Sequence, residues 1–260
     1  MSTAPAPATV LVFAGVDPSG GAGIAADILA IAAQGGHALP VITTLTVQDN
    51  DRVYEVVPVD AALVERQARA LSEKIAIGAV KIGIPGSRAN AQAIADVIVA
   101  LRRRQPDLPV VLDPVLASGH GDTLSRGDAA LALAPLLPLV TLILPNGPEA
   151  LALGGVEGAA AQAAALQARG CRHVLITGGH DSGAVLVNRW FGPGESRDWR
   201  WSRLEGAFHG SGCTLAAAVA ARLAQGDPML LALDGAQAFC QRALAAAYAI
   251  APGQLIPRRR

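Results

Sequence analysis

The stretch His209-Gly210-Ser211-Gly212-Cys213-Thr214 runs directly into an alanine-rich segment at residues 215–224. This pattern predicts a glycine turn that opens a helix, where backbone N–H groups are unpaired and the helix dipole is positive. Such a turn is an anion site. Cys213 lies at the helix start, where we expect its thiol pKa to fall below the ordinary value of about 8.5. The alternative interpretation is a helix with a Gly-Ser N-cap and a small buried cysteine.

Apolar runs of strand length alternate with helical patterns along the rest of the chain. The runs predict strands at residues 10–14, 40–47, 52–59, 79–82, 110–112, 141–144 and 172–177, with a hairpin formed by 183–190 and 199–203. The helical patterns predict helices at residues 23–34, 61–75 and 88–104, and two long helices that begin near Ser211 and Pro228.

This alternation favours a mostly parallel central sheet covered by helices on both faces, a three-layer α/β/α sandwich. We expect a single domain over residues 9–254, with flexible tails at 1–8 and 255–260. Ligands of such sheets bind beyond the carboxyl ends of the strands. The glycine and polar clusters fall at those ends, at residues 15–23, 48–50, 113–122, 146–149 and 178–181.

Composition narrows the classes of function. The 260 residues carry no net charge and 3% aromatic residues, and the one basic block is Arg258-Arg259-Arg260. These values argue against nucleic-acid binding through a basic face or a stacking platform. The only lysines are Lys74 and Lys81, so few lysines are available to bind phosphate.

Cysteine usage and hydropathy predict a cytoplasmic protein. Three scattered cysteines, Cys171, Cys213 and Cys240, are too few for a disulfide framework or a zinc knuckle and fit a reducing compartment. Residues 1–8 lack the basic region of a signal peptide. The most apolar stretch, residues 129–144, is interrupted by prolines, so it predicts a helix end and a buried strand and no membrane span.

A second glycine turn follows the first predicted strand, with the sequence Gly15-Val16-Asp17-Pro18-Ser19-Gly20-Gly21-Ala22-Gly23. It is not a Walker A loop, because no Gly-Lys-Ser/Thr ends it. It contains Gly21-x-Gly23-x-x-Ala26, which matches the dinucleotide fingerprint, with Asp49 at the place of a ribose-binding acid. However, six residues separate Ala14 from Gly21, whereas the fingerprint turn comes directly off its strand. The glycine density instead favours close approach of the backbone to a different ligand.

Four segments of the chain occur in the same order in one known family. They are Ala14-Gly15-Val16-Asp17-Pro18-Ser19-Gly20-Gly21-Ala22-Gly23-Ile24 with Ala26-Asp27, Thr43-Thr44-Leu45-Thr46-Val47-Gln48, Leu112-Asp113-Pro114-Val115, and His209-Gly210-Ser211-Gly212-Cys213-Thr214-Leu215. With them, residues 9–251 resemble the hydroxymethylpyrimidine/phosphomethylpyrimidine kinases of thiamine synthesis, which belong to the ribokinase superfamily. The resemblance implies a ribokinase-like fold.

The resemblance also implies a reaction and its cofactors. Kinases of this family use ATP and Mg²⁺ to phosphorylate 4-amino-5-hydroxymethyl-2-methylpyrimidine, and many then phosphorylate the monophosphate. The turn of Gly210, Ser211, Gly212 and Cys213 would hold the transferring phosphoryl group. Cys213 would stand where sugar kinases of the superfamily have an aspartate base. Phosphoryl transfer depends on positioning and charge neutralisation, which unpaired N–H groups in this turn can supply.

The remaining site residues follow from the same resemblance. Substrate binding is implied for Gly15, Asp27, Gln48, Ile84 and Val115, with the amide of Gln48 on the aminopyrimidine edge. Nucleotide binding is implied for Asn146, Thr177 and Gly179. Asp113 and Glu149 follow strand ends and are the expected Mg²⁺ ligands, because Mg²⁺ prefers hard oxygen atoms, and Asn146 with Glu149 matches the family's Asn-x-x-Glu motif, which holds Mg²⁺ through water.

Several of these residues also have plain structural interpretations. Gln48 fits a solvated strand end, Asp113 a turn former and Glu149 a charge at a helix start. Lys81 fits a structural role on its strand. A packing role fits His209, and core positions fit Cys171 and Cys240.

The chain departs from the family pattern at the phosphate side. Thr177 stands where the family usually has a lysine, and Ile84 stands where it often has a methionine. The family often has a second lysine after Asp-Pro-Val, but residues 117–122 contain none. Each lost charge-assisted contact is worth roughly 1.5–3 kcal/mol, and His120 or an arginine is the candidate replacement. Three alternative functions therefore stay open: a kinase for the monophosphate alone, a pyridoxal-type kinase, and a pseudokinase that senses the pyrimidine without turnover. An exposed flap at residues 52–59 predicts a homodimer.

Overall fold

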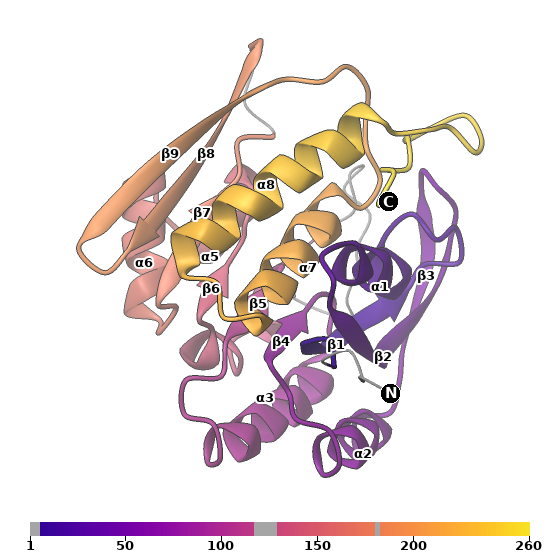
Figure 1. The fold of residues 1–260 in the computed structure, drawn as a ribbon, viewed down its shortest axis with the longest axis vertical. Helices are drawn as coiled ribbons and strands as arrows, with labels where there is room; N and C mark the ends of the chain where they lie inside the picture. Colours follow the sequence, from indigo (N-terminus) through magenta and orange to yellow (C-terminus); the bar gives the residue numbers. More distant parts are fainter. Residues whose placement is uncertain (1–5, 117–128, 180–182) are drawn as a thin grey trace, which may run out of the picture.

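A sheet of nine strands forms the centre of the described protein (Figure 1). The computed structural model describes residues 6–116, 129–179 and 183–260. The strands are β1 (Thr9–Val16), β2 (His37–Gln48), β3 (Val53–Pro58), β4 (Ala79–Ile82), β5 (Val110–Leu112), β6 (Leu142–Ile143), β7 (His173–Ile176), β8 (Val185–Gly192) and β9 (Glu195–Ser202). They lie in the order β3-β2-β1-β4-β5-β6-β7-β8-β9.

The central strands run parallel and the edges run antiparallel. Every pairing from β2 through β1, β4, β5 and β6 to β7 is parallel. The pairs β2–β3, β7–β8 and β8–β9 are antiparallel. The mostly parallel sheet predicted from the sequence is therefore confirmed.

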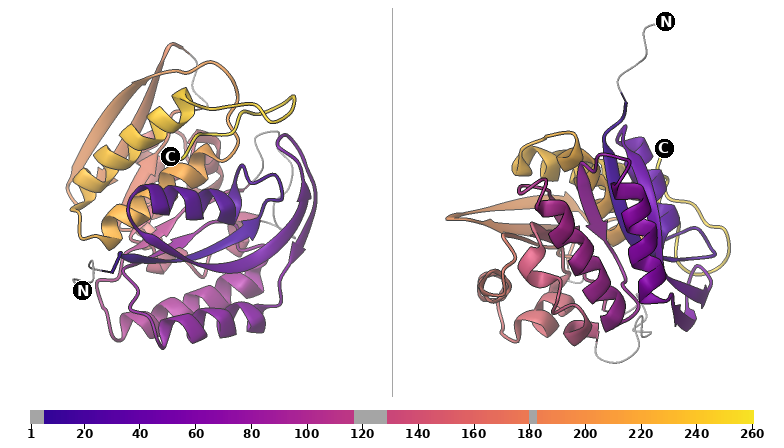
Figure 2. Two further views of the ribbon diagram at one scale, coloured as in Figure 1. Left: turned by 45° about the vertical axis from the view of Figure 1, so that its right-hand side comes forward. Right: turned by 90° about the horizontal axis from the view of Figure 1, so that it is seen from below.

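Helices cover both faces of this sheet, as the two views in Figure 2 show. One layer holds α1 (Gly23–Ala33), α7 (Ser211–Ala224) and α8 (Met229–Ala245). The other holds α2 (Ala61–Ser72), α3 (Arg88–Arg102), α4 (Ala129–Ala132), the 3₁₀ turn Leu137–Leu139, α5 (Gly147–Gly154) and α6 (Ala159–Ala168). The predicted three-layer arrangement is confirmed.

The sheet separates two hydrophobic cores, and successive side chains of β1 point alternately into one and the other. Leu11 and Phe13 pack with α2 and α3, whereas Val10 and Val12 pack with α1 and α7. All four side chains are fully buried. A strand buried on both faces is what a continuous apolar run predicts for the middle of a parallel sheet.

Most element boundaries lie within a few residues of the expected ones. The helix that begins at Ser211 starts there, and the hairpin of β8 and β9 is present. β2 begins at His37, three residues before the expected start, because the His37 N–H pairs with the Ala8 carbonyl. The helical patterns predicted neither α5 nor α6, and a left-handed Gly155 ends the first of these two helices.

The segment at residues 255–260 is not a flexible tail, contrary to expectation. Leu255 forms a bridge with Phe208, and Ile256 forms one with Tyr248. The His209 N–H donates to the Leu255 carbonyl at 2.9 Å. Leu255 and Ile256 are apolar residues that gain from burial, and the basic composition of the last three residues hid this anchor.

The carboxyl ends of the parallel strands lie at one edge of the sheet. In the first helix layer, α1 follows β1 at this edge, and α7 begins there. Ligands of open parallel sheets bind at this edge. Within the described residues, no helix is both long and apolar enough to cross a membrane.

Candidate active site

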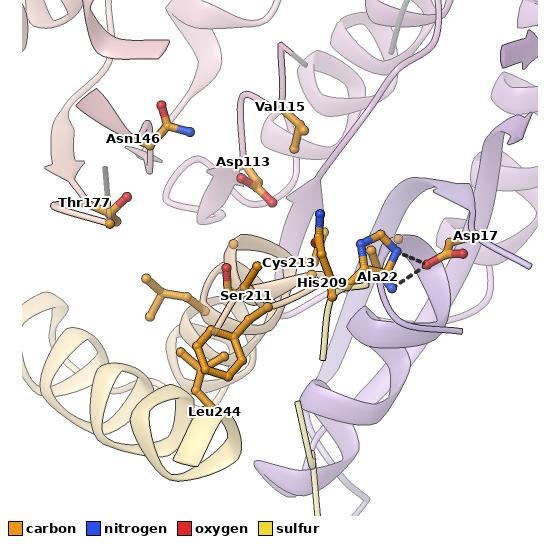
Figure 3. Close-up of a pocket in the computed structure, with 18 of the residues that line it drawn as sticks. Asp17, Ala22, Asp113, Val115, Asn146, Thr177, His209, Ser211, Cys213 and Leu244 are labelled. Carbon is orange, nitrogen blue, oxygen red and sulfur yellow. Dashed lines mark hydrogen bonds and ion pairs between the residues drawn. The ribbon is translucent and has the colours of Figure 1, made fainter. Parts of the chain in front are cut away.

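A cleft of about 560 Å³ opens at the carboxyl ends of the parallel strands. Figure 3 shows Ser211 and Cys213 in this cleft, between Thr177 on one side and Asp17 on the other. Of the site residues expected from the sequence, all but Asp27 line it. The lining residues of that set are Gly15, Gln48, Ile84, Asp113, Val115, Asn146, Glu149, Thr177, Gly179, Gly210, Ser211, Gly212 and Cys213.

The start of α7 is a helix N-terminus without a side-chain cap among the described residues. Gly210 occupies the N-cap position in a left-handed conformation, with φ of 74°. A Cβ atom at Gly210 would lie 2.2 Å from the Gly21 carbonyl oxygen, so space as well as backbone conformation requires glycine there. Of the Gly-Ser cap considered as an alternative, Gly210 takes the N-cap position, but Ser211 is already inside the helix and gives no side-chain cap. The first N–H groups of α7 therefore remain available to an anion.

The two glycine turns lie against each other. His209 Nε2 is 2.8 Å from Asp17 Oδ2, which joins the turn before α7 to the turn after β1 (Figure 3). The Gly23 N–H donates a hydrogen bond to the Cys213 sulfur. The two turns and Cys213 therefore line one cleft.

Asp17 organises the first turn. Its Oδ1 accepts from the Ser19 N–H at 2.8 Å, and its Oδ2 accepts from the Ala22 N–H at 2.6 Å. Burial by itself would raise the pKa of Asp17, but hydrogen bonds from His209 and Ser19 hold it below its usual value. Asp17 is therefore a fixed carboxylate that ties the first turn to the second.

Cys213 is not activated in the way the sequence predicts. Burial raises the pKa of its thiol to about 12, and the carboxylates of Asp113 and Asp27 add to the rise. The charge of Lys81 and the Gly23 N–H act in the other direction but do not prevail. The expected fall is wrong because burial disfavours the charged thiolate. The thiol is protonated at neutral pH, and it donates a hydrogen bond to Asp113.

Asp27 lies beneath the cleft and not in it. Its Oδ2 is 2.8 Å from Lys81 Nζ, and both side chains are fully buried. Burial raises the pKa of Asp27, and the Lys81 ammonium opposes that rise. The expectation that Asp27 contacts substrate is therefore not met, because its carboxylate is taken up by Lys81. Lys81 has the structural role considered from the sequence.

Asp113 and Glu149 provide the oxygen atoms on the floor of the cleft. Asp113 Oδ2 is buried without a hydrogen-bond partner among the described residues. Burial, with the charge of Asp113, raises the pKa of Glu149 to about 8. Glu149 and Asn146 also form a capping box at the start of α5, with both hydrogen bonds at 2.9 Å. Glu149 thus combines the helix-start role with a place in the cleft.

This pair of carboxyl groups fits a divalent cation. A buried oxygen without a partner, next to a second carboxyl whose proton is held tightly, gains from a nearby positive charge. The described residues contain no group of three His, Cys, Asp or Glu placed to hold a metal ion. A cation here would therefore complete its coordination with phosphate and water oxygens, as Mg²⁺ usually does.

Ile84, which follows β4, lines the end of the cleft near β2. The Thr43 hydroxyl donates to the Ile84 carbonyl at 2.5 Å, and the Asn90 amide donates to the Thr43 and Pro85 carbonyls at 2.9 Å each. These bonds fix Ile84 in the wall. Gln48 is half-buried at the end of β2 and lines the cleft, so it is not simply a solvated strand end.

The opposite end lies between α8 and the start of the β8–β9 hairpin. Leu186, Leu215 and Leu244 form its apolar side. Arg203 Nη1 donates to the Gly179 carbonyl at 3.0 Å. Among the described lining residues the arginines are Arg52 and Arg203, and neither lysine of the chain is in this set. His120, the other candidate for the missing charge, lies outside the described residues.

Comparison with known proteins decides the family. The family model for phosphomethylpyrimidine kinase matches residues 17–257. The chain belongs to the phosphomethylpyrimidine kinase family. It is 38% identical over 255 residues to the hydroxymethylpyrimidine/phosphomethylpyrimidine kinase of Rhizobium meliloti, an alignment that covers 95% of this chain and 94% of that protein. The predicted enzyme class, a kinase that transfers a phosphoryl group, is thereby confirmed.

Two solved structures place this member of the phosphomethylpyrimidine kinase family among ribokinase-like folds. An ADP complex of Bacillus subtilis pyridoxal kinase matches with a TM-score of 0.86 and 26% identity over 98% of both chains. A phosphomethylpyrimidine kinase of Clostridium difficile matches with a TM-score of 0.75 and 29% identity over 90% of this chain and 98% of that one. The predicted ribokinase-like fold is confirmed. Since proteins named for two different acceptors share it, the fold alone does not choose the acceptor.

Three charged residues of this kinase were not assigned to the site from the sequence. Asp17 ties the turns together, Arg203 holds the Gly179 loop, and Arg259 lies buried behind the start of α7. The run Asp-Pro-Ser-Gly is a known turn former, which was a usable signal for Asp17. No local pattern marks Arg203 or Arg259, because their partners are distant in sequence.

Proposed function

We propose that this chain transfers the γ-phosphoryl group of ATP to the hydroxyl of 4-amino-5-hydroxymethyl-2-methylpyrimidine, and then to the monophosphate, in thiamine synthesis. The observation that carries the proposal is the contact of the two glycine turns within one cleft, where His209 Nε2 lies 2.8 Å from Asp17 Oδ2. The identity to the Rhizobium meliloti kinase supports a pyrimidine acceptor.

The pyrimidine ring lies against Gly15 in this proposal. Gly15 has no side chain, so its backbone faces the cleft directly. The side chains of Ile84 and Val115 also line the cleft and would make apolar contacts with the ring. The Gln48 amide has one acceptor and two donors, which suits a ring nitrogen beside an exocyclic amine. The hydroxymethyl group then points toward the start of α7.

The transferring phosphoryl group lies at the turn of Gly210, Ser211, Gly212 and Cys213. Unpaired N–H groups and the helix dipole stabilise its equatorial oxygens. Cys213 is a protonated thiol bonded to Asp113, so its sulfur is suited to accept a hydrogen bond from the substrate hydroxyl and orient it. A loose transition state depends on this positioning more than on a strong base.

Asp113 and Glu149 are proposed to hold Mg²⁺, with Asn146 fixing Glu149 through the capping box. The bound ion would neutralise phosphate charge. Thr177, Gly179 and Asn146 face the nucleotide, and the leucines at that end of the cleft contact its base. The ADP complex of the pyridoxal kinase supports nucleotide binding in this fold.

A coupled assay of ADP release tests the function. The acceptors are the pyrimidine alcohol, its monophosphate and pyridoxal, each with ATP and Mg²⁺. We expect turnover with the alcohol and the monophosphate. Turnover with the monophosphate alone would restrict the enzyme to the second step. Absence of turnover with all three, together with tight pyrimidine binding, would support the sensor and overturn the kinase proposal.

A pyridoxal acceptor is the second candidate, favoured by the TM-score of 0.86 to the Bacillus subtilis pyridoxal kinase. The pyrimidine remains the better proposal because sequence identity to the pyrimidine kinase is higher, 38% against 26%. The ratio of kcat/KM for the two alcohols, measured on one enzyme preparation, separates them.

We also propose a homodimer formed through the flap of β2 and β3. Leu45, Val47 and Tyr54 expose 49%, 53% and 67% of their surface there, an apolar face that a second copy would cover. Light scattering of the protein and of Val47→Asp tests this, and a monomer for both would refute it. A cytoplasmic location is supported by the three free thiols.

A further inference from the structure

The side chain of Arg259 is buried behind the turn of Gly210, Ser211, Gly212 and Cys213, which we call the anion turn. It is 4% exposed, whereas Arg258 and Arg260 on either side of it are exposed. Burying a guanidinium is costly unless its donors are paired. The sequence shows one basic block, but the structure separates it into one inward arginine and two outward ones.

The guanidinium of Arg259 bonds to both glycine turns. Its Nε donates to the Thr214 hydroxyl at 2.8 Å, and its Nη2 donates to the Gly21 carbonyl at 2.6 Å. Nη2 also lies 3.4 Å from the His209 carbonyl oxygen and 3.3 Å from that of Gly210. The Thr214 hydroxyl in turn donates to the Gly210 carbonyl at 2.7 Å. One side chain therefore contacts the turn after β1 at Gly21 and the turn before α7 at Gly210 and Thr214.

These contacts set the direction of the amides in the anion turn. In a trans peptide the C=O and the following N–H point in opposite directions. When the carbonyls of His209 and Gly210 turn toward Arg259, the N–H groups of Gly210 and Ser211 face the other way. Gly210 and Ser211 line the cleft, and Arg259 is not among the lining residues. The arginine thus turns those N–H groups toward the place of an anion.

Arg259 also supplies charge where the chain is short of lysine. Lys81 is paired with Asp27, and Lys74 lies near the end of α2, away from the cleft. Nη1 of Arg259 is buried without a hydrogen-bond partner among the described residues, so part of its charge is not neutralised by direct bonds. In a dry site, a fixed positive charge stabilises developing phosphate charge without contacting it.

The segment that carries Arg259 is itself anchored. The Asn50 amide donates to the Pro252 and Gln254 carbonyls at 3.1 and 3.2 Å. Leu255 is bonded on both sides, to Ala207 and to His209. The position of Arg259 is therefore fixed from the flap on one side and from the anion turn on the other.

We propose that Arg259 is a positioning residue for phosphoryl transfer. It orients the amides at the start of α7, holds the two glycine turns together, and places a buried positive charge behind the transferred group. The inference rests on the proposed function of that turn in holding the phosphoryl group.

The test compares three neighbouring arginines with the same substitution. Arg259→Gln is measured against Arg258→Gln and Arg260→Gln for kcat, for KM of each substrate, and for stabilisation by inorganic phosphate in thermal unfolding. We expect kcat of Arg259→Gln to fall about 10- to 100-fold, the range of one charge-assisted hydrogen bond, with loss of phosphate stabilisation. KM for the pyrimidine alcohol should change far less. The two exposed controls should match the natural protein.

Two further variants separate positioning from folding. Arg259→Lys keeps the charge but cannot form the same fork of bonds, so we expect an intermediate kcat. In Arg259→Ala, free guanidinium at concentrations too low to unfold the protein should restore part of kcat, which a purely structural role would not show. If Arg259→Gln does not fold, Thr214→Val, which removes the hydroxyl that relays to Gly210, should lower kcat without raising pyrimidine KM.

Equal kinetics and equal phosphate stabilisation for Arg259→Gln and Arg260→Gln would overturn the inference. So would a lowered melting temperature for Arg259→Gln with kcat unchanged. Failure of the proposed function looks different, because the natural protein itself would then show no turnover with any of the acceptors. The phosphate measurement still tests Arg259 in that case, since it requires no acceptor.

Discussion

The two glycine turns of the cleft are built by different means. The turn after β1 is held mainly by its own residues, since Asp17 accepts from Ser19 and Ala22 within five positions. The turn before α7 has no side-chain cap of its own and is held by distant residues, chiefly Arg259 and the backbone of Leu255. The local turn is encoded by a short motif, whereas the second takes its working shape only from the folded chain.

This difference predicts different failures. Changes in the second turn remove groups aimed at the reacting phosphoryl group, so they should lower kcat. Changes in the first turn or near the proposed pyrimidine ring should act more on substrate binding and on the position of one turn relative to the other. Four variants, in the two turns, at the carboxyl pair and beside the ring, test that division, and their expected effects decrease from Cys213→Ala to Gln48→Ala.

Cys213→Ala is expected to have the largest effect. Loss of the sulfur removes the group that positions the substrate hydroxyl, so kcat should fall about 10²-fold or more. Pyrimidine affinity, measured by calorimetry, should stay within a few-fold. Cys171→Ala removes a thiol from the other core and serves as the control. Parallel losses of turnover and affinity in Cys213→Ala would contradict its assigned role.

Glu149→Gln should weaken Mg²⁺ binding about 10- to 100-fold above pH 8. Burial raises the pKa of Glu149 to about 8, so a proton competes with the cation below that pH, and Mg²⁺ affinity should increase with pH up to that value. The variant should lose this pH dependence. Calorimetric titration of Mg²⁺ at about pH 6 and about pH 9 measures both effects. A pH dependence equal to that of the natural protein would remove Glu149 from the metal site.

The same shift has a stability consequence for the protein without cation. The folded state holds a proton that the unfolded chain releases near its ordinary carboxyl pKa, so this group's contribution to stability falls as pH rises toward 8. Glu149→Gln should be free of that fall. Asn146 remains able to bond to the glutamine side chain, so the capping box is preserved as an internal control.

Asp17→Asn should lower kcat/KM about tenfold, because one carboxylate oxygen that accepts hydrogen bonds becomes a donor. The bond from the Ser19 N–H and the bond from the Ala22 N–H cannot both survive, because they end on different carboxylate oxygens. Because the folded pKa of Asp17 is lowered, its stabilisation is present above the ordinary carboxyl pKa and is lost as pH falls through the folded value. The variant should therefore be less sensitive to acid in urea unfolding. Asp60→Asn, at the cap of α2, is the remote control, and an equal effect there would argue against a special role for Asp17.

Gln48→Ala should have the smallest effect, a rise in pyrimidine KM of about 2- to 10-fold with kcat nearly unchanged. The reason is the loss of one or two hydrogen bonds to the ring edge. Val47→Ala changes the neighbouring side chain, which is outside the set that lines the cleft. Initial rates at varied pyrimidine concentration decide the outcome, and an unchanged KM would remove Gln48 from the site.

Much of the site was predictable because its parts are local motifs. The anion turn, the first glycine turn and the strand ends at Asp113 and Asn146 each carry a pattern of adjacent residues. The protonation state of Cys213 was not predictable, because it depends on how much water and how many carboxylates surround the sulfur. The pairing of Asp27 with Lys81 also depends on two elements that only the sheet brings together.

The amino-acid sequence by itself determined the strand order along the chain, the helices apart from α5 and α6 and the short α4, the mostly parallel sheet and the two glycine turns, since these follow from periodicity and from the backbone freedom of glycine. Only the tertiary structure decided which charges meet. It buried Arg259 while leaving Arg258 and Arg260 in solvent, and it raised the pKa of Cys213 where a helix start alone would lower it. The physical reason is that burial and long-range pairing depend on contacts between residues far apart in sequence.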